Sequence, residues 1–390
     1  MPATARRLST FYLGYFALLG VLLPYLSLYF LDIGLNPYEI GVIAAITPLV
    51  KTVAPSFWGW MADRSGRRLP LMRLSCIGAL ACFSLLLAVK GFWLIAAVMA
   101  LYAIFTSSIL PLVEATAMEA VDRLRVDYGR IRLWGSVGFI AASLGLGPVL
   151  DVAPSILVLW TIVALLAFNL LSVWRLPDST QPTSGTNGHK GGIRKLLTSG
   201  PVLRFYGVCL LMQASHGTYY GFFSVYLEGL GFSRGHIGML WALGVAAEVL
   251  VLMVSGRLLN RLGTRSLLLV ALVLTVLRWG ILAATADLGW LLTAQILHAA
   301  SFGLFHVAAV THTHRIIPAP LRTTGQSLYS SLSFGLGLTV AMYLNGVFYA
   351  TLGAPVLFAV SAGVAAAAAL LALTLSAQPA VPEAARPGAT

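Results

Sequence analysis

Charged residues are scarce in this sequence. Of its 390 residues, 10% are charged and 58% are hydrophobic, whereas a soluble domain carries about 25% charged residues. The apolar stretches also lack the strict alternation, over about ten residues, of membrane β-barrel strands. The composition therefore excludes a soluble domain and predicts an all-α membrane protein.

Cysteines are few, and the common catalytic motifs are missing. Cys76, Cys82 and Cys209 all fall within apolar segments, and the six-residue spacing of the first two on one helix is unsuited to a bridge. His312 and His314 point about 200° apart on a helix, so they cannot share a metal. No Walker, HExxH or GxSxG motif is present. We therefore expect no disulfide, metal, cofactor or enzymatic activity.

Long apolar segments dominate what is present. Twelve of them reach about 20 residues, the length that spans a hydrocarbon core of about 30 Å, and they predict twelve transmembrane helices. These lie near 8–31, 39–62, 70–89, 92–119, 128–150, 154–175, 201–228, 236–258, 266–285, 288–314, 321–349 and 353–376.

The excess of basic residues is one-sided. The chain has 25 Lys and Arg against 13 Asp and Glu, a formal net charge of +12. Of these 25 basic residues, 20 fall in the N-terminal segment, the even-numbered connections and the tail, while only Lys90 and Arg234 fall in the odd-numbered connections. This pattern follows the positive-inside rule. It predicts a multi-pass protein embedded in lipid with both termini in the cytoplasm, and it argues against a nucleic-acid partner.

A polar linker divides the chain into halves. Residues 177–200 are rich in Gly, Ser, Thr and Pro and form the only long break between apolar segments. The sequence predicts an N-terminal six-helix bundle over 1–176 and a cytoplasmic linker over 177–200. It then predicts a C-terminal six-helix bundle over 201–376 and a disordered cytoplasmic tail over 377–390.

The two halves repeat each other with a constant offset of 197 residues. GLNPYEIGVI from Gly34 matches GFSRGHIGML from Gly231, and GWMADRSGRR from Gly59 matches GRLLNRLGTR from Gly256. A register that holds across loops and helices is stronger than chance similarity between apolar helices. We therefore expect the two bundles to be related by pseudo-two-fold symmetry.

The loop after the second apolar segment carries the most specific motif. It reads G-x-x-x-D-R-x-G-R-R, and a degenerate copy with Asn260 in place of the acid recurs in the second half. In a chain of twelve predicted helices with a central linker, this motif resembles the signature loop of the major facilitator superfamily. The resemblance implies a conformational latch formed by Gly59, Asp63, Arg64, Gly66, Arg67 and Arg68.

The chemistry of the loop suits a latch. Gly59 permits close packing of helices, and Asp63 can accept hydrogen bonds from a neighbouring helix N-terminus or an arginine. The alternative is that the arginines only fix the orientation of the chain in the membrane.

A charge pair is predicted at the turn between the fourth and fifth segments. Glu114 lies late in one segment and Arg132 early in the next, each 9 residues from position 123. Residues equidistant from the turn of an antiparallel hairpin lie at equal depth, so the two should meet inside the membrane. Ionisable groups there are costly and usually functional. The alternative is a structural ion pair that closes the hairpin.

The same hairpin carries a second resemblance. PLVEA followed by YGRIRLWGSVGF resembles the corresponding hairpin of lactose permease, of the nucleoside–proton symporters and, most closely, of the bacterial phenylpropionate transporters. The resemblance implies that Glu114 and Arg132 contact the substrate and that Phe139 stacks on it. A guanidinium can bind a carboxylate or a diol through two hydrogen bonds.

Two further ionisable residues are equivalent in the repeat. Lys51 and Glu248 are 197 positions apart, and both fall in the middle of an apolar segment. The lactose permease resemblance implies that Glu248 binds substrate. By symmetry we expect Lys51 to face the cavity between the halves and to pair with an acid or an anionic substrate. The alternative for Lys51 is a side chain that extends into a polar gap.

Proton coupling has candidates in the ninth and tenth segments. VLRWG and QILHAASFGLFH resemble the coupling region of lactose permease, which implies proton handling by Arg278 and His298. Ser301 stands where that region has a carboxylate, so the proton must be carried by Glu248, the hairpin acid or a histidine. Histidine suits this role because its ordinary pKa is about 6.5, and His306 follows in the same segment. The alternative for either histidine is a hydrogen-bonded packing role.

The seventh segment gathers aromatic and polar side chains. QASHGTYYGFFSVY offers Gln213, His216, Tyr219 and Tyr220, and its likeness to the phenylpropionate transporters implies a pocket for an aromatic ring. Aromatic residues that face lipid or the membrane interface are the alternative.

Together these features predict a secondary active transporter of the bacterial inner membrane, a monomer whose two bundles rock around a central site. The leading expectation is proton-coupled import of a small organic solute such as an aromatic carboxylate, bound at Arg132, Lys51 or Arg278. The alternatives are import of a nucleoside, a sugar or an iron–siderophore, export of a drug, or a receptor or flippase that carries no soluble substrate.

Overall fold

Helices form all the regular structure that the computed structural model describes, in residues 1–176, 198–318 and 321–376. The first half contains α1 (Ala3–Asp32), α2 (Pro37–Ser65), α3 (Arg68–Ser84), η1 (Leu85–Leu87), α4 (Phe92–Leu124), α5 (Tyr128–Leu150) and α6 (Ile156–Trp174). The second contains α8 (Gly200–Ser215), α9 (Gly217–Gly229), α10 (Arg234–Ala284), α11 (Leu288–His298), η2 (Ala299–Leu304), α12 (Phe305–Ile316), α13 (Arg322–Ser330), η4 (Ser331–Gly337) and α14 (Leu338–Leu373). The tail predicted to be disordered and most of the predicted linker lie outside the described residues.

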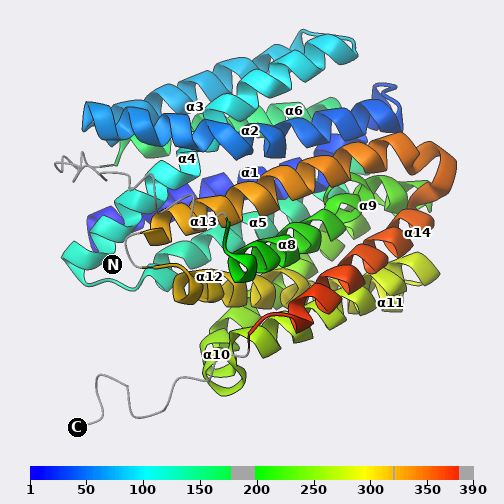
Figure 1. The fold of residues 1–390 in the computed structure, drawn as a ribbon. Helices are drawn as coiled ribbons and strands as arrows, with labels where there is room; N and C mark the ends of the chain where they lie inside the picture. Colours follow the sequence, from blue (N-terminus) through cyan, green and yellow to red (C-terminus); the bar gives the residue numbers. More distant parts are fainter. Residues whose placement is uncertain (177–197, 319–320, 377–390) are drawn as a thin grey trace.

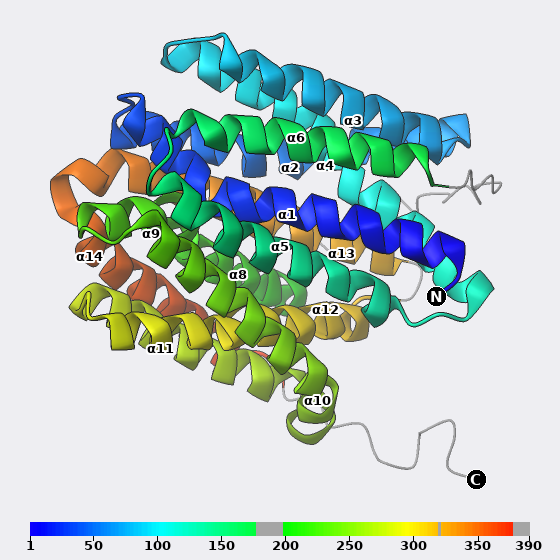
Figure 2. The ribbon, with the colours of Figure 1, turned by 180° about the vertical axis from the view of Figure 1, so that it is seen from behind.

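Twelve membrane crossings follow from these helices. Nine helical runs within the described ranges are long and apolar enough to cross a membrane. Two of the nine, with 51 and 52 residues, are long enough for two crossings each. Each of these bends back at a glycine with positive φ, Gly263 at 74° in α10 and Gly353 at 73° in α14 (Figure 2). Because α8 and α9 together make the remaining crossing, the described residues hold the predicted twelve.

The internal repeat is visible in the backbone. Gly34 and Gly231, 197 residues apart, have φ values of 90° and 84°. Gly66 and Gly263, also 197 apart, both have positive φ values, 60° and 74°, although their ψ values of 11° and 167° differ. Such torsions favour glycine because a Cβ would clash with the backbone. Each pair occupies the same place between consecutive helices of its half, as expected for two copies of one helical arrangement.

The halves pack side by side (Figures 1 and 2). Across the interface α5 packs against α10, α2 against α14, and α1 against α9. The closest approaches lie at the end of the molecule opposite to the N-terminus. There the backbones of Gly41 and Gly346 meet, and Gly238 lies against the carbonyl of Ser143. The interface is therefore tight at this end, since a Cβ at any of these glycines would collide with the partner helix.

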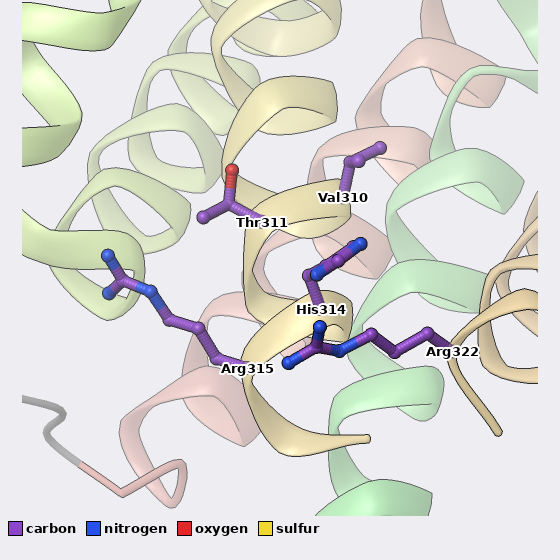
Figure 3. Close-up of a pocket in the computed structure, with 5 residues that line it drawn as sticks. All are labelled: Val310, Thr311, His314, Arg315 and Arg322. Carbon is purple, nitrogen blue, oxygen red and sulfur yellow. The ribbon is translucent and has the colours of Figure 1, made fainter. Parts of the chain in front are cut away.

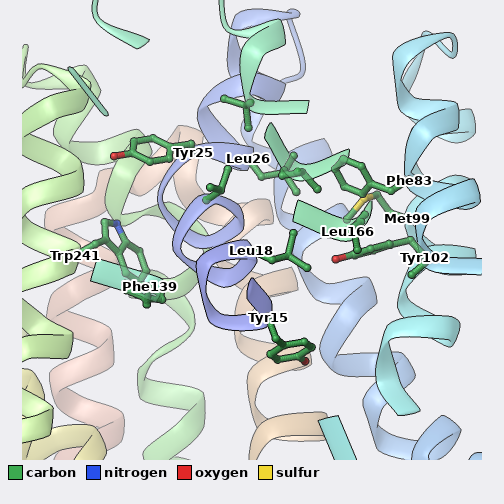
Figure 4. Close-up of a cluster of buried hydrophobic side chains, with 14 of the residues drawn as sticks. Tyr15, Leu18, Tyr25, Leu26, Phe83, Met99, Tyr102, Phe139, Leu166 and Trp241 are labelled. Atoms are coloured by element: carbon green, nitrogen blue, oxygen red, sulfur yellow. The ribbon is translucent and has the colours of Figure 1, made fainter. Parts of the chain in front are cut away.

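The first helix lies at the centre of the larger core. Figure 4 shows α1 with Phe83 and Tyr102 on one side and with Phe139 and Trp241 on the other. Phe139, predicted to stack on the substrate, is buried in this core, and its main chain packs against α1. Because α1 contacts helices of both halves, it borders whatever space remains between them.

Candidate functional site

A cavity of about 330 Å³ lies between the halves. Its walls come from α1, α2 and α4 in the first half and from α9, η2, η4 and α14 in the second. Most of the lining is apolar. The polar side chains are those of Tyr15, Ser27, Thr47, Lys51, Tyr102, Thr106 and Tyr220. A ligand in this cavity would contact both halves at once, as substrates do in transporters built from two bundles.

Lys51 is the one charged side chain among the lining residues. It lies on α2 between Pro48 and Pro55, and its side chain is exposed. Pro48 cannot donate a backbone hydrogen bond, which loosens the helix just before the lysine. Within the described ranges Lys51 makes no hydrogen bond or ion pair. Its ammonium group is therefore available to an anion in the cavity.

Two of the nine residues predicted to bind substrate, Lys51 and Tyr220, line this cavity. The ring of Tyr220 stacks on His216 at 5.9 Å between centroids. His216, Gln213 and Tyr219 are buried within the second half and do not belong to the lining. Of the four side chains that this segment was expected to contribute to an aromatic pocket, only Tyr220 lines the cavity.

The predicted contact between Glu114 and Arg132 is wrong, because the ion pairs of the described residues do not include it. Glu114 instead accepts a hydrogen bond of 2.6 Å from the hydroxyl of Tyr128. The guanidinium of Arg132 lies 3.8 Å from the ring centroid of Phe16 on α1. Neither charged residue lines the cavity.

The turn between α4 and α5 differs from the predicted one. α4 continues to Leu124 and α5 begins at Tyr128, so the turn is centred on position 126 and not on 123. Glu114 and Arg132 are both electrostatic neighbours of Tyr15 and Tyr128, but no ion pair among the described residues joins them. The two helices also diverge, since α4 packs against α2 and α3 whereas α5 packs against α1 and α10.

A cluster of ionisable side chains connects the two halves. Nε2 of His298 lies 4.0 Å from a carboxylate oxygen of Glu248. Gly303 leaves room for this acid, because a Cβ at 303 would lie 2.9 Å from its Cγ. Arg132 on α5 is an electrostatic neighbour of both Glu248 and His306. The arginine predicted to bind substrate therefore lies within electrostatic range of predicted proton-coupling residues, although no ion pair among the described residues joins them.

The π-helix η2 joins this cluster to the cavity. Phe302 lines the cavity. Its ring stacks nearly parallel to those of His298 and His306, with interplanar angles of 9° and 6°, and Nδ1 of His306 lies 3.1 Å from the hydroxyl of Tyr329. Short π-helices are frequent at functional sites. The sequence analysis missed Phe302, although the four-residue spacing of the three rings in QILHAASFGLFH was a usable signal.

Arg278 lies deeper in the second half and is fully buried. Its Nε donates to the carbonyl of Ala294 at 2.9 Å, and its Nη1 donates to the hydroxyl of Ser301 at 3.0 Å. The guanidinium also lies 4.3 Å from the ring centroids of Tyr219 and Trp279. Aromatic faces and neutral acceptors surround this charge, and it does not line the cavity. Arg278 would therefore not contact a ligand bound in the cavity between the halves.

The predicted latch is partly visible. The close packing expected at Gly59 is wrong, because a Cβ built there has nothing within 4 Å. Gly66 ends α2 with the left-handed φ of 60°, and Arg68 forms an ion pair with Glu119 of α4.

The other residues of the predicted latch make only local contacts or are not described. Arg64 lies over the ring of Trp60, and the backbone of Arg67 bonds to Ser65. The side chain of Asp63 lies outside the described part of the structure. The helices at this end are therefore not locked together at Gly59.

The opposite end of the interface is closed by charges. Arg234, at the start of α10, donates to Asp32 of α1 at 2.7 Å and to Glu228 of α9 at 2.8 Å. The main-chain nitrogens of Arg234 and Gly235 donate to the carboxylate of Asp151, at the end of α5. Three acids from both halves thus converge on one helix N-terminus, where carboxylates are favourable. We call these residues the Arg234 cluster.

Comparison with known proteins identifies a matching family, relatives of similar sequence and a solved structure of similar fold. A family model described as the MFS_1 like family matches residues 5–360. The chain is 32% identical over 359 residues to the probable 3-phenylpropionic acid transporter of Escherichia coli (strain K12), covering 90% of this chain and 92% of that protein. It is 28% identical over 339 residues to the maltose permease of Geobacillus stearothermophilus, covering 86% and 85%. The solved structure of nucleoside transporter NupG has a TM-score of 0.85 at 16% identity, covering 95% of this chain and 98% of that one.

Proposed function

Since this multi-pass membrane protein belongs to the MFS_1 like family of major facilitator transporters, we propose that it imports a small aromatic monocarboxylate together with protons. The observation that carries the proposal is Lys51, a cation that forms no ion pair with any residue the structure describes, in an otherwise uncharged and mostly apolar cavity between the halves. A cation in hydrocarbon is costly unless it serves a ligand or a partner. An anionic substrate would supply that partner.

The shape and chemistry of the cavity favour an acid with a ring. Its volume of about 330 Å³ is at the small end of ligand sites, which span about 300–1,000 Å³. Phe302, Phe334 and Tyr220 offer aromatic faces, and leucines of α1 cover another wall. A ring would pack against these side chains while its carboxylate reached Lys51. The 32% identity to a probable 3-phenylpropionic acid transporter supports the same class of substrate.

A polyhydroxylated ligand fits this lining less well. A sugar buries many hydroxyl groups, and each needs a hydrogen-bonding partner to offset its desolvation. Among the lining hydroxyls, Thr106 already donates to the carbonyl of Tyr102 at 3.0 Å. The other polar lining side chains are widely outnumbered by apolar ones, which favours a ligand with fewer hydroxyl groups than a disaccharide. We therefore propose monocarboxylate transport ahead of the sugar and nucleoside alternatives.

The proton is proposed to bind at the Glu248–His298 pair. The pair is the one contact between an acid and an imidazole among the ion pairs of the described residues. Protonation would change its charge beside Arg132 of the other half, and so change the relative energy of inward-open and outward-open states. The ring of Phe302 lies between this site and the cavity.

The proposed location is the bacterial cytoplasmic membrane with both termini in the cytoplasm. The bias of Lys and Arg between connections supports this orientation. With it, the end closed by the Arg234 cluster faces the periplasm, and the end at which Gly59 is unpacked faces the cytoplasm. We further propose bundle boundaries at 1–176 and 201–376, connected by a cytoplasmic linker.

Counterflow in proteoliposomes tests the substrate class. Vesicles loaded with 3-phenylpropionate should take up the labelled acid, and neither maltose nor uridine should compete with it. An inside-alkaline pH gradient should then drive accumulation above equilibrium. Uptake of uridine or maltose with no uptake of the acid would disprove the proposed substrate. If the accumulated amount of the labelled acid does not depend on the pH gradient, the proposed proton coupling is disproved, but the proposed substrate is not.

A further inference from the structure

A second cavity, of about 400 Å³, lies at the end of the molecule that contains the N-terminus. It is lined by Val310, Thr311, His314 and Arg315 of α12 and by Arg322 of α13. Figure 3 shows Arg322 reaching from α13 toward His314. Three of its five lining residues are arginine or histidine, and none is acidic.

These basic side chains have no bonding partner in the part of the chain that the structure describes. His314, Arg315 and Arg322 make no hydrogen bond or ion pair with any described residue. Thr311 donates its hydroxyl to Val307 of its own helix. Positively charged side chains that line one cavity repel each other unless an anion binds between them.

Helix stability explains only part of this arrangement. His314 and Arg315 lie in the last turn of α12, where cations interact favourably with the helix dipole. Arg322 is the first residue of α13, where a cation is unfavourable. That helix begins without an acid in its first turn and without a side-chain cap. The side chain of Arg322 is exposed, and its charge follows the positive-inside pattern, but its place in the first turn of α13 would become favourable with an anion bound beside it.

We propose that this cavity binds a phosphate group through Arg315 and Arg322. Guanidinium groups match phosphate through paired hydrogen bonds, and the uncapped start of α13 adds free backbone N–H groups. With the proposed orientation the cavity faces the cytoplasm, where phosphate is carried by anionic phospholipid headgroups and by free phosphorylated solutes. Either source presents the same group to the same residues.

The test measures binding to the purified full-length protein and needs no transport. The variant is Arg315→Gln/Arg322→Gln. The matched control is Arg6→Gln/Arg7→Gln, which removes the same charge from exposed side chains at the same end of the molecule. One arm titrates phosphatidylglycerol against phosphatidylcholine in mixed micelles. The other titrates inorganic pyrophosphate. The readouts are the binding constant and the melting temperature.

At least one probe should raise the melting temperature of the wild type and of the control. The double variant should bind it roughly tenfold more weakly or worse, since charge-assisted bonds are lost. Response to phosphatidylglycerol alone identifies a lipid site, and response to pyrophosphate identifies a solute site. The proposal is overturned if neither probe binds, if the variant binds as the wild type does, or if the control loses as much. Arg322→Ala, which removes the unfavourable helix charge, serves if the double variant does not fold.

Discussion

At the scale of single residues, the unpaired lysine is the most informative side chain. A lysine at the centre of a membrane helix costs about 2.5–3.5 kcal/mol on insertion scales. Lys51 sits on a proline-interrupted helix with no partner among the described residues, so no ion pair offsets that cost. A substrate carboxylate would offset it on binding.

Lys51→Met is expected to weaken binding of the aromatic acid at least about tenfold, because one charge-assisted contact is lost. The protein should remain folded, since the new side chain is apolar in an apolar lining. Binding is measured by tryptophan fluorescence or calorimetry on the purified variant. Lys51→Arg, which keeps the charge, is the matched comparison. If Lys51→Met binds the acid with unchanged affinity, another cation must bind the carboxylate of the substrate.

The acid beside His298 gives the second prediction at this scale. Glu248→Gln should abolish accumulation driven by a pH gradient, because the neutral amide cannot exchange a proton. Counterflow should persist, since Glu248 does not line the cavity. Glu114→Gln is the comparison, because that acid is bonded to Tyr128 and forms no ion pair with a histidine among the described residues. If Glu114→Gln loses uphill transport and Glu248→Gln retains it, the proton site has been assigned to the wrong acid.

At the scale of elements, η2 is the connection between the cavity and the ionisable cluster. Phe302 forms part of the cavity wall, and its ring contacts two imidazoles. When either imidazole is protonated, its contact with the ring becomes a cation–π interaction of about 0.5–2 kcal/mol. The wall of the cavity should therefore be held more firmly in the protonated state.

Phe302→Leu should weaken the dependence of substrate affinity on pH while leaving counterflow active. Leucine keeps the wall apolar but cannot stack on an imidazole. Affinities of the wild type and the variant are measured as a function of pH. Phe334→Leu is the control, because Phe334 also lines the cavity but contacts the imidazole of His306 only edge-on, at 73°. An equal loss of pH dependence in both variants would contradict a specific role for the stack.

At the scale of the whole molecule, the two ends of the interface differ. At one end the Arg234 cluster and the glycine contacts hold α5 to α10 and α2 to α14. At the other end Gly59 is unpacked. Opening the closed end requires breaking the bond of Arg234 to Asp32 and the main-chain bonds to Asp151, because both acids belong to the first half. Glu228 lies in the same half as Arg234, so its bond can persist.

Arg234→Gln should shift the population toward the state that is open at this end. Loss of the Arg234–Asp32 ion pair, which crosses the interface, is worth about 1 kcal/mol, or roughly a fivefold change in the ratio of states. The measurement is the labelling rate of Ser27→Cys, a cavity position, by an impermeant reagent, with Cys76, Cys82 and Cys209 replaced by alanine. Lys90→Gln is the charge-matched control, because Lys90 is exposed on the same predicted side. Slower or unchanged labelling in Arg234→Gln would show that the cluster does not hold this end closed.

The sequence by itself determined the number of crossings and the repeat, because both depend on hydrophobic length and on a fixed register. The positive φ values of Gly66 and Gly263 follow from that register. The repeat also singled out Lys51, since its equivalent position carries Glu248. The predicted Glu114–Arg132 ion pair failed because the partners of each side chain depend on tertiary packing, which turns Glu114 to Tyr128 and Arg132 to Phe16.

Only the tertiary structure decided which side chains line the cavity. The segments are apolar all round, so periodicity cannot distinguish a face toward lipid from a face toward the cavity. Tyr219 and Tyr220 are adjacent in the sequence, yet only Tyr220 reaches the lining. The rotation of each helix about its axis is set by packing against its neighbours. That packing, and not the local sequence, places Lys51 and Phe302 in one cavity and buries Arg278 outside it.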